Sequence, residues 1–216
     1  MALQITTWVY VKDVTALTWF YNQMMNDTPT HTPRAVTHIK EASQTLGFTM
    51  NCDDLTGNLL KTLAASKPGG RLLELGTGTG LSTVWIAEGM DKTSTLWTVE
   101  LEEKYSQVAQ QVLGDDKRIK FFVEDGTSFL EHHQSERFDF IFADTWPGKY
   151  WSLEIALNMV KSGGFYIVDD MIEQPNWPEG HAEKAKALLE TLKHRTDFIS
   201  SKLNWSTGLI ICTKLE

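Results

Sequence analysis

The chain has 216 residues, of which 42% are hydrophobic, and its formal net charge at pH 7 is −8. This length and composition allow a sizeable buried core. The negative charge and an isoelectric point near 5.3 give no general attraction to nucleic acid or to an anionic membrane surface, so we expect neither as a partner. A small molecule is the expected ligand.

The cysteines and the N-terminal stretch bear on the cellular compartment. Cys52 and Cys212 lie far apart, and Cys212 belongs to the apolar run GLIICTK, where a buried thiol is expected. The stretch MALQITTWVYVKDV lacks the basic start and long apolar segment of a secretory signal. No apolar run approaches the roughly 20 residues that span a bilayer. We therefore expect a cytoplasmic protein.

The first third of the chain has a helical character. Residues 1–48 contain helical pieces interrupted by Pro29 and Pro33, and we predict that they form an N-terminal helical cap over the site. A further helix is expected next, because leucines recur at helical spacing between residues 55 and 63 before the stop signal PGG.

From residue 71 onward, short apolar runs alternate with longer helix-like stretches, which is the pattern of parallel βα units. The last two runs, DFISSKLNW and STGLIICTK, leave room only for a short turn, which predicts an antiparallel hairpin at the sheet edge. The predicted class is α/β, with a Rossmann-like, doubly wound, mostly parallel seven-stranded sheet. Residues 1–216 are expected to form a single domain with its core at 49–216. The parallel strands are predicted at 71–76, 94–101, 119–125, 137–145 and 163–171.

The first strand ends in the turn LGTGTGLST, whose alternating glycines allow positive φ and close approach of a ligand to the main chain. In an open parallel sheet, this turn is where a nucleotide-like cofactor binds. A dinucleotide fingerprint would place its third glycine at Leu81. Glu74 would oppose a pyrophosphate, but it suits the ammonium and sulfonium of S-adenosylmethionine. The turn therefore favours S-adenosylmethionine, with Glu74, Gly76, Thr77, Gly78, Gly80 and Ser82 as expected contacts.

Two further strand ends offer groups to the same cofactor. Glu100, followed by Leu101, ends the second strand 20 residues beyond Gly80. A carboxylate at this place accepts hydrogen bonds from both ribose hydroxyls, a feature that fits a dinucleotide equally well. The run Asp125-Gly126-Thr127 after the third strand could bind the adenine amino group, and the alternative is an N-cap for the next helix.

Several of these segments together carry a family resemblance. In order and spacing, LLELGTGTGLST, TVELEEKY, VEDGTSFL, FDFIFADTWPGKY and GGFYIVDDM resemble the S-adenosylmethionine-dependent O-methyltransferases of the catechol and caffeoyl-CoA type. The resemblance covers about residues 46–212 and implies methylation of a small-molecule hydroxyl. It further implies that Met50 and Asn51 close over the methionine end of the cofactor.

Three acidic residues, Asp144, Asp169 and Asp170, end two neighbouring predicted strands, where they would repel one another unless a cation or proton lies between them. The resemblance implies a divalent cation, Mg²⁺, and Ca²⁺ suits the same hard oxygen ligands. Alternatively, Asp144 binds the cofactor ammonium, and Asp169 or Asp170 caps the following loop. The family usually has asparagine at the last position, so Asp170 is a departure that adds charge.

The resemblance also implies a general-base lysine three residues after Asp144, but this chain has Pro147 there, which cannot accept a proton. Lys149 could reach the same space from a reshaped turn, or it could be an exposed lysine at the start of a helix. His181 is a second candidate base, because its ordinary pKa is close to neutrality, and the alternative is a helix N-terminal surface. The catalytic candidates are therefore Asp144, Lys149 and His181.

Eight tryptophans are a high number for core packing alone. An aromatic wall would favour a flat or cationic acceptor, whereas the same side chains could anchor a homodimer interface. We place Trp146 beside the cofactor. A non-catalytic S-adenosylmethionine-binding protein and a nicotinamide-dependent oxidoreductase remain the alternative functions. The aromatic residues expected near the strand ends are Trp146, Tyr150, Trp151, Trp177 and Trp205.

Overall fold

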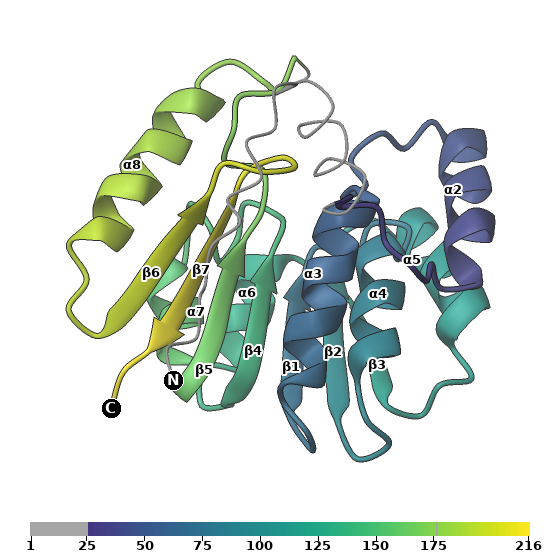
Figure 1. Ribbon diagram of the computed structural model, residues 1–216, viewed down its shortest axis with the longest axis horizontal. Helices are drawn as coiled ribbons and strands as arrows, with labels where there is room; N and C mark the ends of the chain where they lie inside the picture. The colour runs from purple at the N-terminus through teal and green to yellow at the C-terminus, as the bar shows by residue number, and fades with distance from the viewer. Residues whose placement is uncertain (1–25, 176) are drawn as a thin grey trace, which may run out of the picture.

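The computed structural model describes residues 26–175 and 177–216, and its central feature is a seven-stranded sheet (Figure 1). The strands are β1 (Arg71–Leu75), β2 (Thr95–Glu100), β3 (Ile119–Val123), β4 (Phe138–Ala143), β5 (Val160–Val168), β6 (Phe198–Leu203) and β7 (Leu209–Lys214). Their order across the sheet is β3-β2-β1-β4-β5-β7-β6. Strands β1 to β5 are parallel to one another, and β7 is antiparallel to both β5 and β6. The α/β class, the mostly parallel sheet and the C-terminal hairpin predicted from the sequence are confirmed.

The predicted strand positions agree with the observed ones, with one larger difference at β5. The sequence predicted a start at Gly163, but β5 begins at Val160. Val160 pairs with Phe138 of β4, and the register then shifts before Phe140. The strand therefore continues through its two glycines and does not begin at them.

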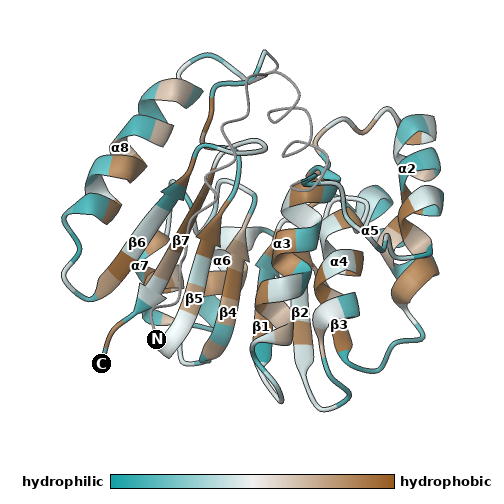
Figure 2. Cartoon of the chain, viewed as in Figure 1, coloured by the Kyte–Doolittle hydropathy of each residue, from teal (hydrophilic) through white to brown (hydrophobic). Residues whose placement is uncertain are grey.

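Helices cover both faces of the sheet and create two apolar cores. The helices are α2 (Ala35–Leu46), α3 (Asp54–Ala65), α4 (Leu81–Gly89), α5 (Glu103–Leu113), α6 (Gly126–His132), α7 (Leu153–Asn158) and α8 (His181–Lys193). Leu72 of β1 packs in the core with α3 and α4, whereas Leu73 packs in the core with α6, α7 and α8. Successive side chains of a strand point to opposite faces, so a strand covered on both sides is apolar throughout. Brown segments lie along these strands in Figure 2, and the helices carry brown segments as well.

The position of the site follows from the strand order. β1 lies between β2 and β4. Strands β2 and β3 are added on one side of β1, and β4 and β5 on the other, so the direction of strand addition reverses between β1 and β4. Helices that follow β1 and β4 leave from opposite faces, and the carboxyl ends of these two strands border a crevice in such sheets. The glycine turn after Leu75 and the acidic segment after Ala143 therefore meet at one edge of the sheet.

Of the predicted N-terminal cap, residues 1–25 lie outside the described residues. The described part packs against the core through α2, where Ile39 is buried beside Trp85 of α4. The preceding segment reaches the β6–β7 hairpin, since the Trp205 indole nitrogen donates to the Asp27 carboxylate at 3.0 Å. The described N-terminal residues thus contact α4 through α2 and the β6–β7 hairpin through Asp27.

The two cysteines, Cys52 and Cys212, are unpaired and buried, which confirms the buried thiol predicted at Cys212. Across residues 26–175 and 177–216, no helix has the length and apolar character needed to cross a membrane.

Helices α3 and α4 approach so closely that two glycines are required between them. A Cβ built on Gly89 would lie 2.1 Å from the Lys61 carbonyl oxygen, and one on Gly57 would lie 2.3 Å from the Trp85 ring. Real side chains do not occupy such positions, so a methyl group at Gly89 must separate the backbones of the two helices.

We predict that Gly89→Ala lowers the free energy of unfolding by about 2–3 kcal/mol, since overpacking against a rigid backbone cannot relax locally. Urea denaturation measures this. Gly163→Ala is the control, because its added methyl meets no atom within 4 Å. Its only cost is the strain of a left-handed backbone conformation, about 1 kcal/mol. Equal losses in both variants would show that the two helices can separate at little cost.

Candidate functional site

The glycine turn after β1 has the backbone geometry that its sequence predicts. Gly76, Gly78 and Gly80 have φ values of 103°, 53° and 97°, which side-chain-bearing residues rarely adopt. A Cβ on Gly76 would lie 2.9 Å from the Asp144 carbonyl oxygen, and one on Gly78 would lie 2.8 Å from the Phe48 ring. The glycines therefore serve both the turn and its close packing against the chain after β4.

A polar clamp, made by Ser43, Asn51 and Thr79, ties this turn to α2. The Asn51 amide nitrogen donates to the Ser43 hydroxyl at 2.9 Å, and the Thr79 hydroxyl donates to the Asn51 amide oxygen at 2.9 Å. The two hydroxyls lie 2.7 Å apart. Asn51 thus holds the turn, and the neighbouring Met50 is 66% exposed. No sequence pattern marks Ser43 or Thr79, because the clamp joins segments that are distant in the chain.

Glu74 lies beneath the turn and is fully buried. One of its carboxylate oxygens accepts hydrogen bonds from Thr83 at 2.5 Å and Thr98 at 2.6 Å, while the other oxygen has no partner within the described residues. Burial raises the pKa of Glu74 to about 7, although the hydrogen bonds from Ser82, Thr83 and Thr98 oppose the shift. Glu74 therefore supports the glycine turn from inside the fold. The predicted contact Ser82 is buried as well.

Glu100, at the end of β2, is fixed by two backbone amides. Its carboxylate accepts from the Gly78 amide at 2.8 Å and from the Glu102 amide at 3.0 Å. The two bonds orient the side chain along the wall of a pocket of about 110 Å³. The pocket is lined by Leu75, Gly76, Val99, Glu100, Leu101, Glu124, Asp125, Gly126, Thr145 and Pro147. Five of the predicted cofactor contacts, Gly76, Glu100, Leu101, Asp125 and Gly126, thus share one cavity.

The residues that follow β3 and the neighbouring threonines complete the surroundings of this pocket. Asp125 is the N-cap of α6 and accepts from the Ser128 amide at 2.9 Å, so the capping alternative is confirmed. Thr127 is half-buried in the first turn of α6. The Thr77 hydroxyl lies 2.6 Å from that of Thr98, inside the fold. Pro147 closes the wall, since a Cβ on Gly126 would lie 2.9 Å from the proline ring.

The acidic segment lies at the adjoining strand ends. The Asp169 carboxylate accepts from the Thr207 hydroxyl and from the Asp170 amide. Both Asp170 carboxylate oxygens accept from the Trp177 indole at 2.8 Å. Burial raises the pKa of Asp169 to about 6 and that of Asp144 well above its ordinary value. Asp170 has a φ of 59°, a conformation that Asp and Asn tolerate best among residues with side chains.

Lys149 is only 3% accessible, so the alternative of an exposed lysine at the start of a helix is wrong. Its ammonium nitrogen lies 2.6 Å from the Asp169 carbonyl oxygen and 3.5 Å from that of Asp170. Burial lowers the pKa of Lys149, and the charges of Asp144, Asp170 and Asp169 oppose that shift. The lysine therefore enters the acidic segment from the reshaped turn.

His181 is buried within an aromatic cluster at the same edge of the sheet, so the surface alternative is wrong. Its ring stacks on Trp177 at 4.2 Å between centroids, and its Nε2 is hydrogen-bonded to the Tyr150 hydroxyl at 2.9 Å. Trp146 meets the same ring edge-on at 5.9 Å. Burial lowers the pKa of His181, which favours the neutral imidazole that can accept a proton.

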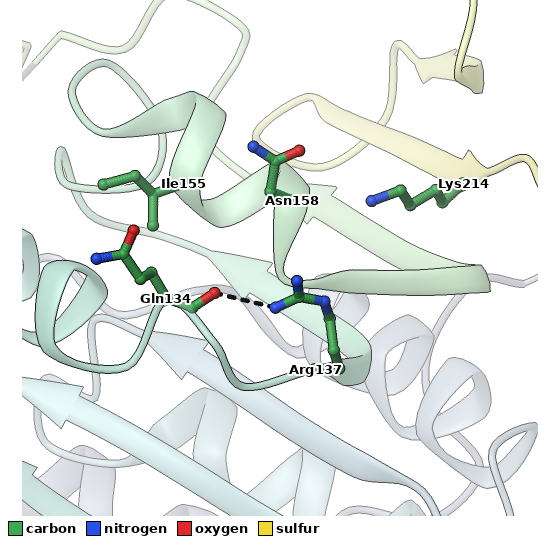
Figure 3. A pocket seen from close by; sticks show the side chains of 5 residues that line it. All are labelled: Gln134, Arg137, Ile155, Asn158 and Lys214. Carbon is green, nitrogen blue, oxygen red and sulfur yellow. Dashed lines mark hydrogen bonds between the residues drawn. The ribbon is translucent and has the colours of Figure 1, made fainter.

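A larger groove, of about 400 Å³, lies at the opposite edge of the sheet (Figure 3). Arg137 directly precedes β4 and Lys214 ends β7, so the groove borders the amino ends of the parallel strands. The Arg137 guanidinium donates to the Gln134 carbonyl oxygen at 2.9 Å. None of the predicted site residues lines this groove, and we place the site at the carboxyl edge, where turns and titratable groups meet.

A glycine turn, a strand-end carboxylate and buried titratable groups thus meet at the carboxyl ends of a doubly wound α/β sheet, where proteins of this fold class bind their ligands. The sequence pattern described as O-methyltransferase matches residues 30–214, and the chain belongs to this family. Similar curated proteins include catechol O-methyltransferase B of Danio rerio, 27% identical over 135 residues, which cover 58% of this chain and 51% of that protein. The catechol O-methyltransferase of Mycobacterium tuberculosis is 28% identical over 120 residues, 54% of each chain. The matches thus span about half the length of these relatives.

Solved structures of similar fold include the O-methyltransferase TomG from Streptomyces achromogenes, described in complex with SAM. Its TM-score is 0.76 at 20% identity, over 93% of this chain and 96% of that one. An O-methyltransferase from Bacillus cereus, described in complex with SAH, has a TM-score of 0.77 at 19% identity, over 92% and 99% of the two chains. At this level of identity the likeness establishes the shared fold.

The raised pKa of Glu74 leads to a prediction about stability. Below its ordinary range the carboxyl is protonated in both states, and between this range and pH 7 only the folded chain holds the proton. The parent therefore loses stability as pH rises through this interval, by up to roughly 3 kcal/mol. Glu74→Gln lacks this loss, so its stability relative to the parent should increase between pH 4.5 and 8 in urea denaturation. A constant difference across this range would show that Glu74 titrates normally.

Proposed function

We propose that this chain transfers a methyl group from S-adenosylmethionine to a hydroxyl oxygen of a small-molecule acceptor. Membership of the O-methyltransferase family supports the reaction class. The observation that carries the proposal is the pocket between β1 and β2, where the glycine turn meets a carboxylate held in place by two backbone amides. A nucleoside with two ribose hydroxyls matches that carboxylate.

The residues present fit S-adenosylmethionine. The positive φ values of Gly76, Gly78 and Gly80 form a turn free of side chains, whose main chain could lie against a ligand. Glu100 is placed to accept from the ribose, and Gly126 and Pro147 form the facing wall of the same pocket. Asp144, whose carbonyl oxygen lies against Gly76, would face the positively charged end of the cofactor. When bound, the cofactor supplies a methyl group on a positively charged sulfur, and the sulfur leaves as a neutral thioether.

The protein's own contribution would be to position the acceptor and remove its proton. The bond from the acceptor oxygen to the methyl carbon forms as the bond from that carbon to sulfur breaks, and the hydroxyl proton must leave. We assign its path to the Tyr150 hydroxyl and then to Nε2 of His181, which lie 2.9 Å apart. Burial raises the pKa of Tyr150, so the phenol would pass a proton on and remain neutral itself. Trp146 and Trp177 flank the imidazole and would suit an aromatic acceptor.

The resemblance implied Mg²⁺ at Asp144, Asp169 and Asp170, but these side chains do not fit a metal centre as they are placed. Across the part of the chain that the structure describes, no three His, Cys, Asp or Glu side chains are arranged to hold a metal ion. Trp177 occupies both Asp170 oxygens, and Thr207 occupies an oxygen of Asp169. We therefore derive no step through a metal.

Two other sequence expectations belong to this proposal. Trp151 is 39% exposed beside the aromatic cluster, which supports the predicted homodimer contact there. The unpaired thiols of Cys52 and Cys212 support the predicted cytoplasmic location, where thiols stay reduced. Sedimentation of the purified protein and fractionation of the native cells would test the two expectations.

The proposal is tested by incubating the protein with methyl-labelled cofactor and a panel of phenols, catechols and aliphatic alcohols. Label transferred to a hydroxyl oxygen supports it. Tight binding of S-adenosylhomocysteine with no transfer to any acceptor favours the non-catalytic binding protein that Pro147 suggested. Binding of NAD(H) in place of S-adenosylhomocysteine would favour the oxidoreductase.

We predict that Glu100→Ala weakens S-adenosylhomocysteine binding by about 1–3 kcal/mol, the usual loss when charge-assisted hydrogen bonds to a buried ligand are removed. Titration calorimetry measures the affinity, and thermal unfolding of the free protein reports whether the fold survives. Glu102→Ala is the control, because Glu102 is exposed and contributes only its backbone amide. An affinity unchanged in Glu100→Ala would remove Glu100 from the site.

We predict further that His181→Gln lowers kcat by about 10²-fold, the usual share of a general base, on whichever acceptor the panel yields. S-adenosylhomocysteine affinity should stay within about twofold, since His181 lies outside the cofactor pocket. Tyr150→Phe should lower kcat similarly, because it interrupts the same path. A normal kcat in both variants would return the base role to Lys149.

A further inference from the structure

The turn after β4 brings a lysine into the interior from an unexpected position. Residues 146–151 fold back on themselves, since the Lys149 and Tyr150 amides both donate to the Trp146 carbonyl oxygen, at 3.1 and 2.8 Å. Gly148 has a φ of 81°, and a Cβ there would lie 2.4 Å from Leu75. This compact loop points the Lys149 side chain under the carboxyl end of β5.

The ammonium of Lys149 lies close to acidic residues whose negative charge it can neutralise. Its nitrogen donates to the carbonyl oxygens of Asp169 and Asp170, which are the residues whose carboxylates would crowd this edge. Only 3% of Lys149 and 2% of Asp169 are accessible. Like charges this deep in a protein require an opposite charge beside them or a proton on one of them. Lys149 is buried without a carboxylate within ion-pair distance in the described residues, so its charge serves the acidic group as a whole.

From this geometry we infer that the Lys149 ammonium is the cation that neutralises the acidic side chains at the ends of β4 and β5, namely Asp144, Asp169 and Asp170, and that this protein binds no divalent ion there. The inference rests on the proposed function, because it concerns the acceptor side of the same site. Lys149 is on this account a positioning residue. Its charge holds the ends of β4 and β5 together and fixes Asp170, which in turn accepts from the Trp177 indole that stacks on His181.

The placement explains the departure from the family pattern at Pro147. A lysine three residues after Asp144 would lie at Pro147, whose ring instead closes the cofactor pocket against Gly126. The lysine that arrives two positions later is anchored by carbonyl oxygens of β5's end. A divalent ion would have to displace the Trp177 indole before it met the Asp170 carboxylate oxygens, and burying a second cation near the Lys149 ammonium is unfavourable.

The test follows Mn²⁺ binding by the electron paramagnetic resonance signal of the free ion, with the protein saturated with S-adenosylhomocysteine. We expect the parent to bind no Mn²⁺ at this site up to millimolar concentrations. Lys149→Met removes the positive charge near the three carboxylates, so it should bind Mn²⁺ roughly tenfold more tightly than the parent, and Mn²⁺ should raise its melting temperature. Lys149→Arg, which keeps the charge, should behave as the parent does.

Lys184→Met is the matched control, because Lys184 lies at the same site over the Trp146 ring but does not contact the ends of β4 and β5. It should bind no Mn²⁺. A parent that binds one Mn²⁺ per chain and loses it in Asp169→Asn would overturn the inference, and this pair decides the matter if Lys149→Met does not fold. A folded Lys149→Met that gains no Mn²⁺ would overturn it also. Failure of S-adenosylhomocysteine to bind at the start would instead refute the proposed function.

Discussion

One carbonyl oxygen organises the carboxyl edge of this sheet. The Val99 carbonyl of β2 accepts from both the Gly76 and Thr77 amides, at 2.9 and 3.0 Å, and so fixes the path of the chain as it leaves β1. Because the turn is held to β2, the Gly78 amide reaches the Glu100 carboxylate at the end of the same strand. The wall of the pocket lined by Gly76 and Glu100 is therefore a result of strand pairing.

The polar groups around this edge share one physical problem, which is that charge buried in a protein must be matched. Glu74 is matched by hydroxyls and by a raised pKa. Glu100 is matched by backbone amides. Lys149 is matched by carbonyl oxygens and by nearby carboxylates. Three different solutions to the burial of charge thus stand side by side at this edge of the sheet.

The sequence predicted what depends on local pattern and missed what depends on tertiary turns. Apolar runs and their spacing predicted the strands and the hairpin, because burial on both faces leaves a compositional signal. The glycine turn was predicted because only glycine fits its φ values. The burial of Lys149 was not, since it depends on the loop at Gly148 and on β5. The clamp of Asn51 with Ser43 and Thr79 joins three distant segments, and no local pattern encodes it.

The strand order at the other end of the sheet has a consequence for synthesis. β7 lies between β5 and β6 although it follows both in the chain. During synthesis, β5 and β6 are both made before β7, the strand that pairs with each of them. This edge of β5 therefore stays unpaired until residues 209–214 have been made. Until then the apolar edge of β5, with Tyr166 and Val168, exposes unpaired backbone groups that favour association with other chains. A chain folding on the ribosome would therefore hold strands β1 to β5 with this edge open, and formation of the β6–β7 hairpin closes it.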